Sequence, residues 1–278
     1  APPPATDPAP APPPATAPAR PGLSLRQVTF RYGAHAEPVL AGLDLDLPYG
    51  DHLAVVGASG IGKSTLAALV AGVLRPGHGE VRVDGVPVTS LTPAQLARRR
   101  VLIPQEAYVF TGSVRDNLAY LSGDGSDDAL GRAVAALGLS PLLHRLGGYD
   151  ATVRPADLSA GERQLVALAR AWLSPAPLVI LDEATCHLDP ATEAGIERAF
   201  ADRPGTLVVI AHRVSSALRA RRVLLLDGGT AVLDTHDRLL ARAPAYRELV
   251  GYWTGTPDDL AGSRPDDLPR AGQSQPDC

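Results

Sequence analysis

Residues 53–74 read Leu-Ala-Val-Val-Gly-Ala-Ser-Gly-Ile-Gly-Lys-Ser-Thr-Leu-Ala-Ala-Leu-Val-Ala-Gly-Val-Leu. The apolar run at 53–56 is typical of a strand that is buried on both faces of a sheet. Three glycines follow within six residues, and after them the apolar residues recur at helical spacing through residue 74. The stretch therefore predicts a buried strand, a tight loop and a helix in direct succession.

The loop in this stretch matches the phosphate-binding pattern G-x-x-x-x-G-K-[ST]. Glycines let the backbone curl so that amides and the helix N-terminus point at phosphate oxygens. In this pattern Lys63 meets the β- and γ-phosphates, and the Ser64 hydroxyl reaches Mg²⁺. Lys63 is the one lysine beside 25 arginines, and its compact ammonium suits a space that a planar guanidinium does not fit. The predicted nucleotide-binding residues are Gly57, Ala58, Ser59, Gly60, Ile61, Gly62, Lys63, Ser64 and Thr65.

Further apolar runs predict the rest of an α/β fold. Such runs alternate with helical patterns and lie at residues 101–103, 178–181, 207–210 and 223–226. Runs of this kind are typical of a mostly parallel sheet with helices on both faces. Residues 23–30 and 80–88 instead alternate apolar and polar side chains, with a hairpin turn at Asp84-Gly85, and predict an antiparallel β subdomain. From about residue 106 to residue 173, the pattern is mostly helical and predicts a helical subdomain.

An acidic pair, Asp182-Glu183, ends the apolar run at residues 178–181. Asp182 can hold Mg²⁺ through water, and Glu183 can face the γ-phosphate as a general base. An isolated pair of this kind is more often a helix-capping group. Beside a phosphate-binding loop, it indicates a Walker B strand.

A third element, Leu158-Ser-Ala-Gly-Glu-Arg-Gln, stands directly upstream of that strand. Ser159 and Glu162 form an S-x-x-E capping box, which alone indicates only a well-capped helix. The order of the three elements, however, resembles the nucleotide-binding (ATPase) domain of an ABC transporter over about residues 23–253. The family signature is LSGGQ, and the residues that stand in its place are Leu158, Ser159, Ala160, Gly161 and Glu162.

The resemblance implies roles for four further residues. Tyr32 stands where the family has an aromatic residue that stacks on adenine, and Gln105 stands in the Q-loop, which touches Mg²⁺ and the attacking water. Asp189 stands at the D-loop position of the family, and His212 stands at the position of its switch histidine. The implied catalytic residues are Glu183, His212 and Gln105, and the implied metal ligands are Ser64, Gln105 and Asp182.

The same resemblance implies an ATPase with ATP and Mg²⁺ as cofactors, in which two such domains, alike or different, close head to tail on two nucleotides. The signature loop of one domain then acts on the nucleotide of the other. Residues 105–118 look like the exporter branch, whose transmembrane domain usually lies upstream on the same polypeptide. These features imply a domain that powers substrate export at the cytoplasmic face of the cell membrane.

The signature departs from the family pattern at two positions. Ala160 replaces a usual glycine, and Glu162 replaces a usual glutamine. The added methyl group is expected to crowd the approach of the second domain. Glu162 brings a negative charge near phosphate unless the capping box turns it back to its own helix. The sequence leaves open whether turnover is slower as a result.

Composition narrows the function classes. The formal net charge of −4 gives no basic field for DNA or RNA, and we expect no nucleic-acid partner. The two cysteines form no disulfide framework, and no apolar stretch approaches the ~20 residues that cross a bilayer. We expect a Pro/Ala-rich disordered linker at 1–21, the ATPase domain at 22–253 and a disordered tail at 254–278.

The chain lacks methionine and begins with this linker, which favours a segment of a longer polypeptide, although removal of an initiator Met would look the same. Two alternative functions stay open at this stage. One is an ABC-type ATPase without a membrane partner, which the near-neutral charge and the single ATPase unit disfavour. The other is a weakly hydrolysing subunit of a heterodimer, which the altered signature fits.

Overall fold

The computed structural model describes residues 21–254. Most of the predicted linker and tail therefore lie outside the described residues. Pro21 already belongs to the first strand, and residue 254 belongs to the last helix.

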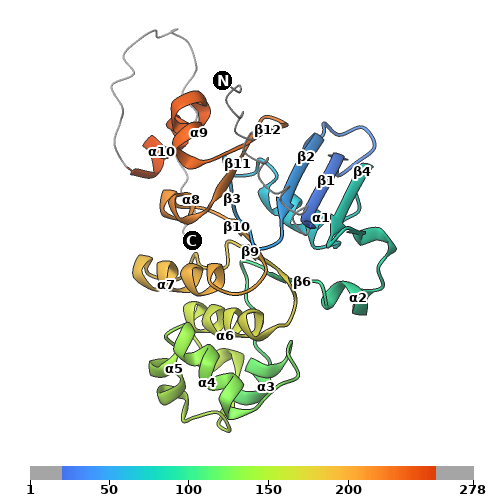
Figure 1. Ribbon diagram of the computed structural model, residues 1–278. Coiled ribbons are helices and arrows are strands. Elements are labelled where there is room, and N and C mark those ends of the chain that lie inside the picture. Colours follow the sequence, from blue (N-terminus) through green and yellow to red (C-terminus); the bar gives the residue numbers. More distant parts are fainter. Residues whose placement is uncertain (1–20, 255–278) are drawn as a thin grey trace, which may run out of the picture.

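A six-stranded sheet forms the centre of the molecule, and all its neighbouring strands are parallel except at one edge, where the last strand turns back (Figure 1). Its strands, in spatial order, are β12 (Thr230–Asp234), β11 (Arg222–Asp227), β3 (His52–Val56), β10 (Thr206–Ile210), β9 (Leu178–Asp182) and β6 (Arg100–Ile103). Every residue of β3 and β10 is buried, because helices or strands cover both faces. The predicted parallel core sheet is thus confirmed.

A four-stranded antiparallel sheet packs beside the central sheet. Its order is β2 (Leu40–Pro48), β1 (Pro21–Phe30), β4 (His78–Val83) and β5 (Val86–Pro87). The hairpin between β4 and β5 turns at Asp84 and Gly85, which both have positive φ (50° and 76°), as a type I′ turn requires. The predicted antiparallel subdomain is present, and it includes β2, which we did not predict.

Helix α1 (Lys63–Val70) fills the space between the two sheets. Leu66 and Leu69 share one hydrophobic cluster with β3 residues Leu53 and Val55 and with the antiparallel sheet. The expected helix to residue 74 was too long, because Gly72 adopts φ 69° and stops it after Val70.

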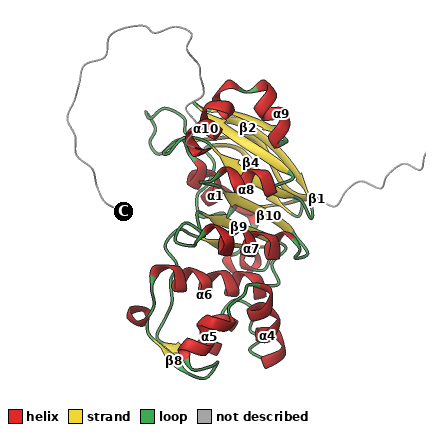
Figure 2. Cartoon of the chain, turned by 90° about the vertical axis from the view of Figure 1, so that its left-hand side faces the viewer, coloured by secondary structure: helices red, strands yellow, loops and turns green. Residues whose placement is uncertain are grey.

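Five helices cover the opposite face of the central sheet, and this face is turned toward the viewer in Figure 2. Alternate residues of each strand point this way, as the two-residue period of a strand dictates. The helices are α6 (Ala160–Leu173), α7 (Pro190–Ala201), α8 (Val214–Arg219), α9 (His236–Arg242) and α10 (Pro244–Thr254).

A helical region lies below α6 in Figure 1, on the side of this helix that faces away from α7. It contains α3 (Val114–Ala119), α4 (Asp127–Ala136), α5 (Ser140–Leu146), a short ladder of β7 (Gly112–Ser113) with β8 (Thr152–Val153), and the 3₁₀ turn η2 (Pro155–Asp157). Outside it, η1 (Val88–Ser90) and α2 (Pro93–Ala97) connect β5 to β6. Within residues 21–254, no helix is both long and apolar enough to span a bilayer.

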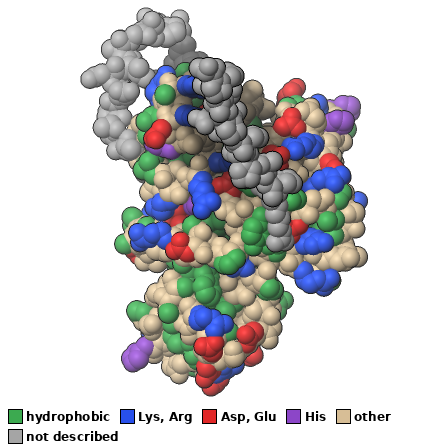
Figure 3. All heavy atoms as spheres, viewed as in Figure 1, with side chains coloured by type: hydrophobic (Ala, Val, Ile, Leu, Met, Phe, Trp, Pro, Cys, Tyr) green, Lys and Arg blue, Asp and Glu red, His purple; other side chains and the backbone are tan. Residues whose placement is uncertain are grey.

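Charged side chains of both signs are interspersed over the face shown in Figure 3. This mixture agrees with the near-neutral formal charge of the sequence.

The register of the parallel strands places the loops that follow β3, β9 and β10 side by side, along the edge of the sheet that the carboxyl ends of these strands form. Ile210 at the end of β10 pairs with Val55 on one side and with Asp182 on the other. The residues that follow these strands include Gly57, Glu183 and His212. Since ligands of open α/β sheets bind beyond the carboxyl ends of the strands, this edge is the candidate site.

Candidate active site

The side chain of Lys63 lies inside the loop that follows β3. Only 6% of the residue is exposed, and its ammonium donates hydrogen bonds to the carbonyl oxygens of Gly57 (3.0 Å) and Ala58 (2.9 Å). Burial lowers the pKa of Lys63, while the carboxylates of Glu183 and Asp182 act in the opposite direction. The loop thus holds one desolvated positive charge at its centre, which is the charge that a bound phosphate requires.

At two positions of the loop, neighbouring atoms lie so close to the backbone that a side chain would not fit. Gly57 has φ 151°, and a Cβ atom there would lie 2.5 Å from the carbonyl oxygen of Leu226. Gly62 has φ 112°, and a Cβ atom there would lie 2.6 Å from Val39. Only glycine therefore fits this tight turn at both positions.

Helix α1 begins at this loop without a side-chain cap, and its first turn carries no acidic residue. By contrast, Ser159 caps α6 and Asp189 caps α7. An N-terminus without a side-chain cap presents amide hydrogens and the positive end of the helix dipole to an anion. The loop and helix together therefore fit the phosphates of a nucleotide.

Ser64 and Asp182 meet across the edge of the sheet, as the two motifs predict. The Ser64 hydroxyl donates a hydrogen bond of 3.0 Å to Oδ1 of Asp182. Burial is the main cause that raises the pKa of Asp182, and the Ser64 hydrogen bond opposes it. A hydroxyl and a carboxylate are oxygen ligands of the kind that Mg²⁺ prefers, so the residues present fit this ion.

Glu183 and His212 are in direct contact, with the imidazole Nε2 against Oε1 of the carboxylate. Glu183 is 14% exposed in its side chain and adopts φ 54°, which is unusual for a residue with a side chain. Such a backbone costs roughly 1–3 kcal/mol and is found at functional sites. The conformation carries the carboxylate toward the histidine that follows β10.

Tyr32 lies beside the start of α1. Its hydroxyl is 2.9 Å from Oγ1 of Thr65, and its ring packs edge-on against Phe30 at 5.0 Å between centroids. The residue is 68% exposed. An exposed aromatic face next to a phosphate-binding loop is available for stacking on a nucleotide base.

Gln105 follows β6 and is exposed, and within residues 21–254 its side chain makes no hydrogen bond with Ser64 or Asp182. Its carbonyl oxygen instead accepts a 3.0 Å hydrogen bond from Gln164. Gln164 is 1% exposed, and its Oε1 accepts a 3.2 Å hydrogen bond from the amide of His187. We did not predict this link, in which one buried glutamine of α6 joins the loops after β6 and β9.

The segment that stands in the place of the family signature forms the start of α6, with Leu158 buried at 4% exposure. The predicted capping box is present, since Ser159 and Glu162 exchange hydrogen bonds in both directions. Gly161 packs against the loop after β9, because a Cβ atom there would lie 3.1 Å from the His187 carbonyl oxygen. Within the described chain, no hydrogen bond joins this segment to the loop that holds Lys63.

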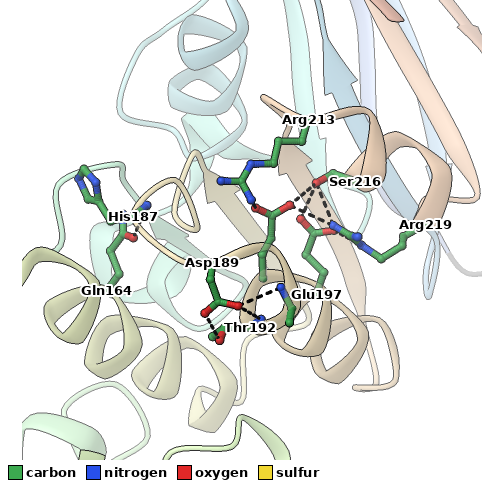
Figure 4. A network of polar contacts seen from close by, with 10 residues as sticks. Gln164, His187, Asp189, Thr192, Glu197, Arg213, Ser216 and Arg219 are labelled. Carbon is green, nitrogen blue, oxygen red and sulfur yellow. Dashed lines mark hydrogen bonds and ion pairs between the residues drawn. The ribbon is translucent and has the colours of Figure 1, made fainter. Parts of the chain in front are cut away.

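Asp189 caps α7 with a side chain that accepts hydrogen bonds of 3.0 Å from the amides of Ala191 and Thr192 (Figure 4). The Thr192 hydroxyl also donates to this carboxylate and is the largest cause that lowers the pKa of Asp189. The cap fixes the loop between β9 and α7.

Two buried carboxylates on α7 tie this helix to α8 and to the residue after His212. Glu197, which is 0% exposed, accepts hydrogen bonds from Ser216 (2.7 Å) and Arg219 (2.8 Å), as Figure 4 shows. Glu193 lies 3.0 Å from Arg213 and 3.1 Å from Arg219. The sequence carried no motif for this cluster, which holds the histidine loop against α7.

We expect Glu197→Ala to lower the free energy of unfolding by about 3 kcal/mol, because Ser216 and Arg219 lose a fully buried acceptor while Arg219 keeps Glu193 as its second partner. Urea unfolding of the chain measures this loss. Arg132→Ala is the matched control, since Arg132 is 59% exposed in an ion pair with Asp128 and should matter by about 0.5 kcal/mol or less. A Glu197→Ala variant as stable as this control would contradict the structural role of the cluster.

Several known proteins of one family are similar to this chain. The family described as "ABC transporter" matches residues 40–186. The chain is 64% identical over 235 residues to the ABC transporter ATP-binding protein RamB of Streptomyces coelicolor, covering 84% of this chain and 39% of RamB. It is 40% identical over 228 residues to the ATP-dependent lipid A-core flippase of Chromohalobacter salexigens, covering 80% of this chain and 39% of the flippase.

A solved structure, that of a bacterial Atm1-family ABC exporter with ATP bound, matches with a TM-score of 0.77 and 32% identity. The match covers 87% of this chain and 43% of the exporter chain. The chain thus spans about two fifths of the length of these similar proteins. The phosphate-binding loop, its partner strand and these likenesses together identify the chain as a member of the ABC transporter family that carries the family's ATP-binding fold.

Proposed function

We propose that the chain binds and hydrolyses MgATP, and that this reaction powers export across a membrane. The observation that carries the proposal is the meeting of two pairs at one sheet edge, Ser64 with Asp182 and Glu183 with His212, beside the buried Lys63. These pairs supply oxygen ligands, a base and positive charge within reach of one phosphate chain.

The first step is binding. The amides of the loop and of the α1 N-terminus receive the phosphates, and the Lys63 ammonium neutralises charge on the β- and γ-phosphates. The exposed ring of Tyr32 stacks on adenine. The nucleotide is thereby fixed at both of its ends.

Ser64, Asp182 and Gln105 are the residues that would hold Mg²⁺. When bound, the ion neutralises charge that develops on the phosphate oxygens during phosphoryl transfer. Burial already discourages an unpaired charge on Asp182, as its raised pKa indicates. A cation at this place favours the ionised carboxylate.

Glu183 acts as the general base that takes a proton from the attacking water. Its contact with His212 supports this role, because Nε2–H of the histidine holds the carboxylate in place, and the same N–H can donate to the γ-phosphate once it turns from Glu183. A positioned base contributes roughly 10²- to 10⁴-fold to the rate, and the rest comes from positioning and charge.

The signature segment acts in trans. Residues 158–162 of one copy cap the γ-phosphate bound by the other copy, and Asp189 lines the contact between the copies. The second nucleotide-binding domain is either an identical chain or a related one. A hollow of about 370 Å³ lined by Gln105, Ala160 and His187, among others, adjoins this segment and offers a recess for the partner.

Two of the similar proteins are named mycobactin import ATP-binding/permease proteins, and the direction of transport is proposed from others. One is named a lipid A-core flippase, another a multidrug efflux ATP-binding/permease protein of Mycobacterium bovis, and a third is the Atm1-family exporter. We propose that the transmembrane domain of this transporter is encoded upstream on the same polypeptide. The ATPase domain then works at the cytoplasmic face of the cell membrane, without nucleic acid.

The dimeric mechanism predicts how hydrolysis depends on concentration. We expect the rate of phosphate release per chain to rise in proportion to chain concentration while most of the protein is monomeric, because two chains build each active unit. A phosphate-release assay over a hundredfold range of chain concentration measures it. A rate per chain that stays constant over that range would contradict the trans site, and the absence of Mg²⁺-dependent phosphate release at the highest concentration would contradict hydrolysis itself.

A further inference from the structure

The glutamate of the signature segment is turned back onto its own helix. Glu162 is 25% exposed in its side chain, and its Oε2 accepts hydrogen bonds from the amide (2.9 Å) and the hydroxyl (3.0 Å) of Ser159. The capping box therefore uses one of the two carboxylate oxygens. It leaves the other oxygen for a different partner.

That partner is Arg145, which comes from another helix. Its Nη2 lies 2.6 Å from Oε1 of Glu162, so the two oxygens of the carboxylate are divided between Ser159 and Arg145. Arg145 stands in the last turn of α5, where a positive side chain also interacts favourably with the helix dipole. Its side chain is 48% exposed, so it remains at the surface beside the start of α6.

Glu162 is charged at neutral pH. Burial tends to raise the pKa of this carboxyl group, but the Ser159 hydrogen bonds and the Arg145 guanidinium outweigh it and hold the pKa of Glu162 below its usual value. A full negative charge thus sits within the segment that is to approach a phosphate. Like charges brought together at an interface cost several kcal/mol, so this charge needs compensation.

We propose that Arg145 is a positioning residue for the trans ATP site, which neutralises Glu162 and keeps its carboxylate turned away from the incoming γ-phosphate. The inference rests on the proposed function, in which this segment caps the nucleotide of a second copy. It explains how a chain with glutamate at position 162 brings the start of α6 close to an anion.

The test measures ATP-driven dimerisation of the 278-residue chain in the Glu183→Gln background. Light scattering with saturating MgATP gives the chain concentration at which half of the protein is dimeric. We expect Arg145→Gln to raise this concentration about tenfold, which corresponds to about 1.4 kcal/mol. Each dimer contains two such segments, and the loss of the arginine from each segment is expected to raise the concentration about threefold. Arg132→Gln is the matched control and should leave the concentration unchanged, because its exposed ion pair lies within α4.

Second-site variants separate charge compensation from simple packing of α5 on α6. Glu162→Gln removes the charge and keeps the capping box, so this chain should dimerise at least as tightly as the background. Adding Arg145→Gln to Glu162→Gln should then have less than a twofold effect, and Arg145→Lys should restore most of the loss in the chain that keeps Glu162.

Two outcomes would overturn the proposal. The first is that Glu162→Gln, Arg145→Gln and the double variant weaken dimerisation equally, which is the result of a contact that only packs the two helices. The second is that Arg145→Gln dimerises like the Arg132→Gln control while the background chain dimerises with MgATP. If the background chain itself fails to dimerise, the proposed function fails and this inference fails with it.

Discussion

Replacing Glu183 by glutamine reduces ATP hydrolysis by about 10²- to 10⁴-fold and leaves ATP binding intact, because the amide keeps the shape of the carboxylate but accepts no proton. The contact with His212 and the position after β9 make this side chain the base of the proposed mechanism. Phosphate release and nucleotide binding, measured on the same preparation, separate the two effects. The ATP-loaded state of this variant persists, since its nucleotide is not consumed.

A matched control for this prediction is Glu80→Gln, on the antiparallel sheet away from the candidate site. Glu80 is paired at the surface with Arg82 at 2.6 Å, so its replacement should leave the hydrolysis rate within about twofold. If Glu183→Gln hydrolyses ATP at the rate of this control, the assignment of the base is wrong.

Lys63→Arg weakens ATP binding by about 10²-fold, or about 2.7 kcal/mol, although the charge is conserved. The ammonium is enclosed by the loop and bonded to the carbonyl oxygens of Gly57 and Ala58, where a wider planar guanidinium does not fit. Isothermal titration with MgATP measures the change in affinity. Thermal unfolding without nucleotide shows whether the variant is folded.

Arg132→Lys is the control for this exchange, since it swaps the same two residue types on the exposed face of α4. It should bind ATP like the parent chain. An unchanged affinity in Lys63→Arg would show that the loop has room for a guanidinium. It would contradict the steric reason for a lysine at this position in a chain so rich in arginine.

The sequence predicted the parts of the fold that have a strong local signal. Buried parallel strands are apolar throughout, so β3, β9 and β10 stand out, and the Asp84-Gly85 pair marks a hairpin without any tertiary information. Strand β2 was missed although Leu43-Asp-Leu-Asp-Leu47 alternates apolar and polar side chains at the period of a half-buried strand. Strand β12 is half-exposed at the sheet edge and carries little apolar pattern.

In the candidate site, too, some residues could be predicted from the sequence and others could not. Lys63, Ser64 and Asp182 belong to motifs, and their proximity follows from parallel strands that end at one edge. The positive φ of Glu183 has no signature, because glutamate rarely adopts it. Gln164 and Arg145 act through partners that are distant in the sequence or on another helix, so only the folded chain reveals them.

In the proposed mechanism, two chains enclose ATP between the loop of one and the signature segment of the other. Its most direct test is the molar mass of the Glu183→Gln chain in solution, measured by light scattering with and without MgATP. We expect the 28.9 kDa mass of the single chain without nucleotide and twice that mass with MgATP. A chain that binds MgATP stoichiometrically and remains at 28.9 kDa would contradict it.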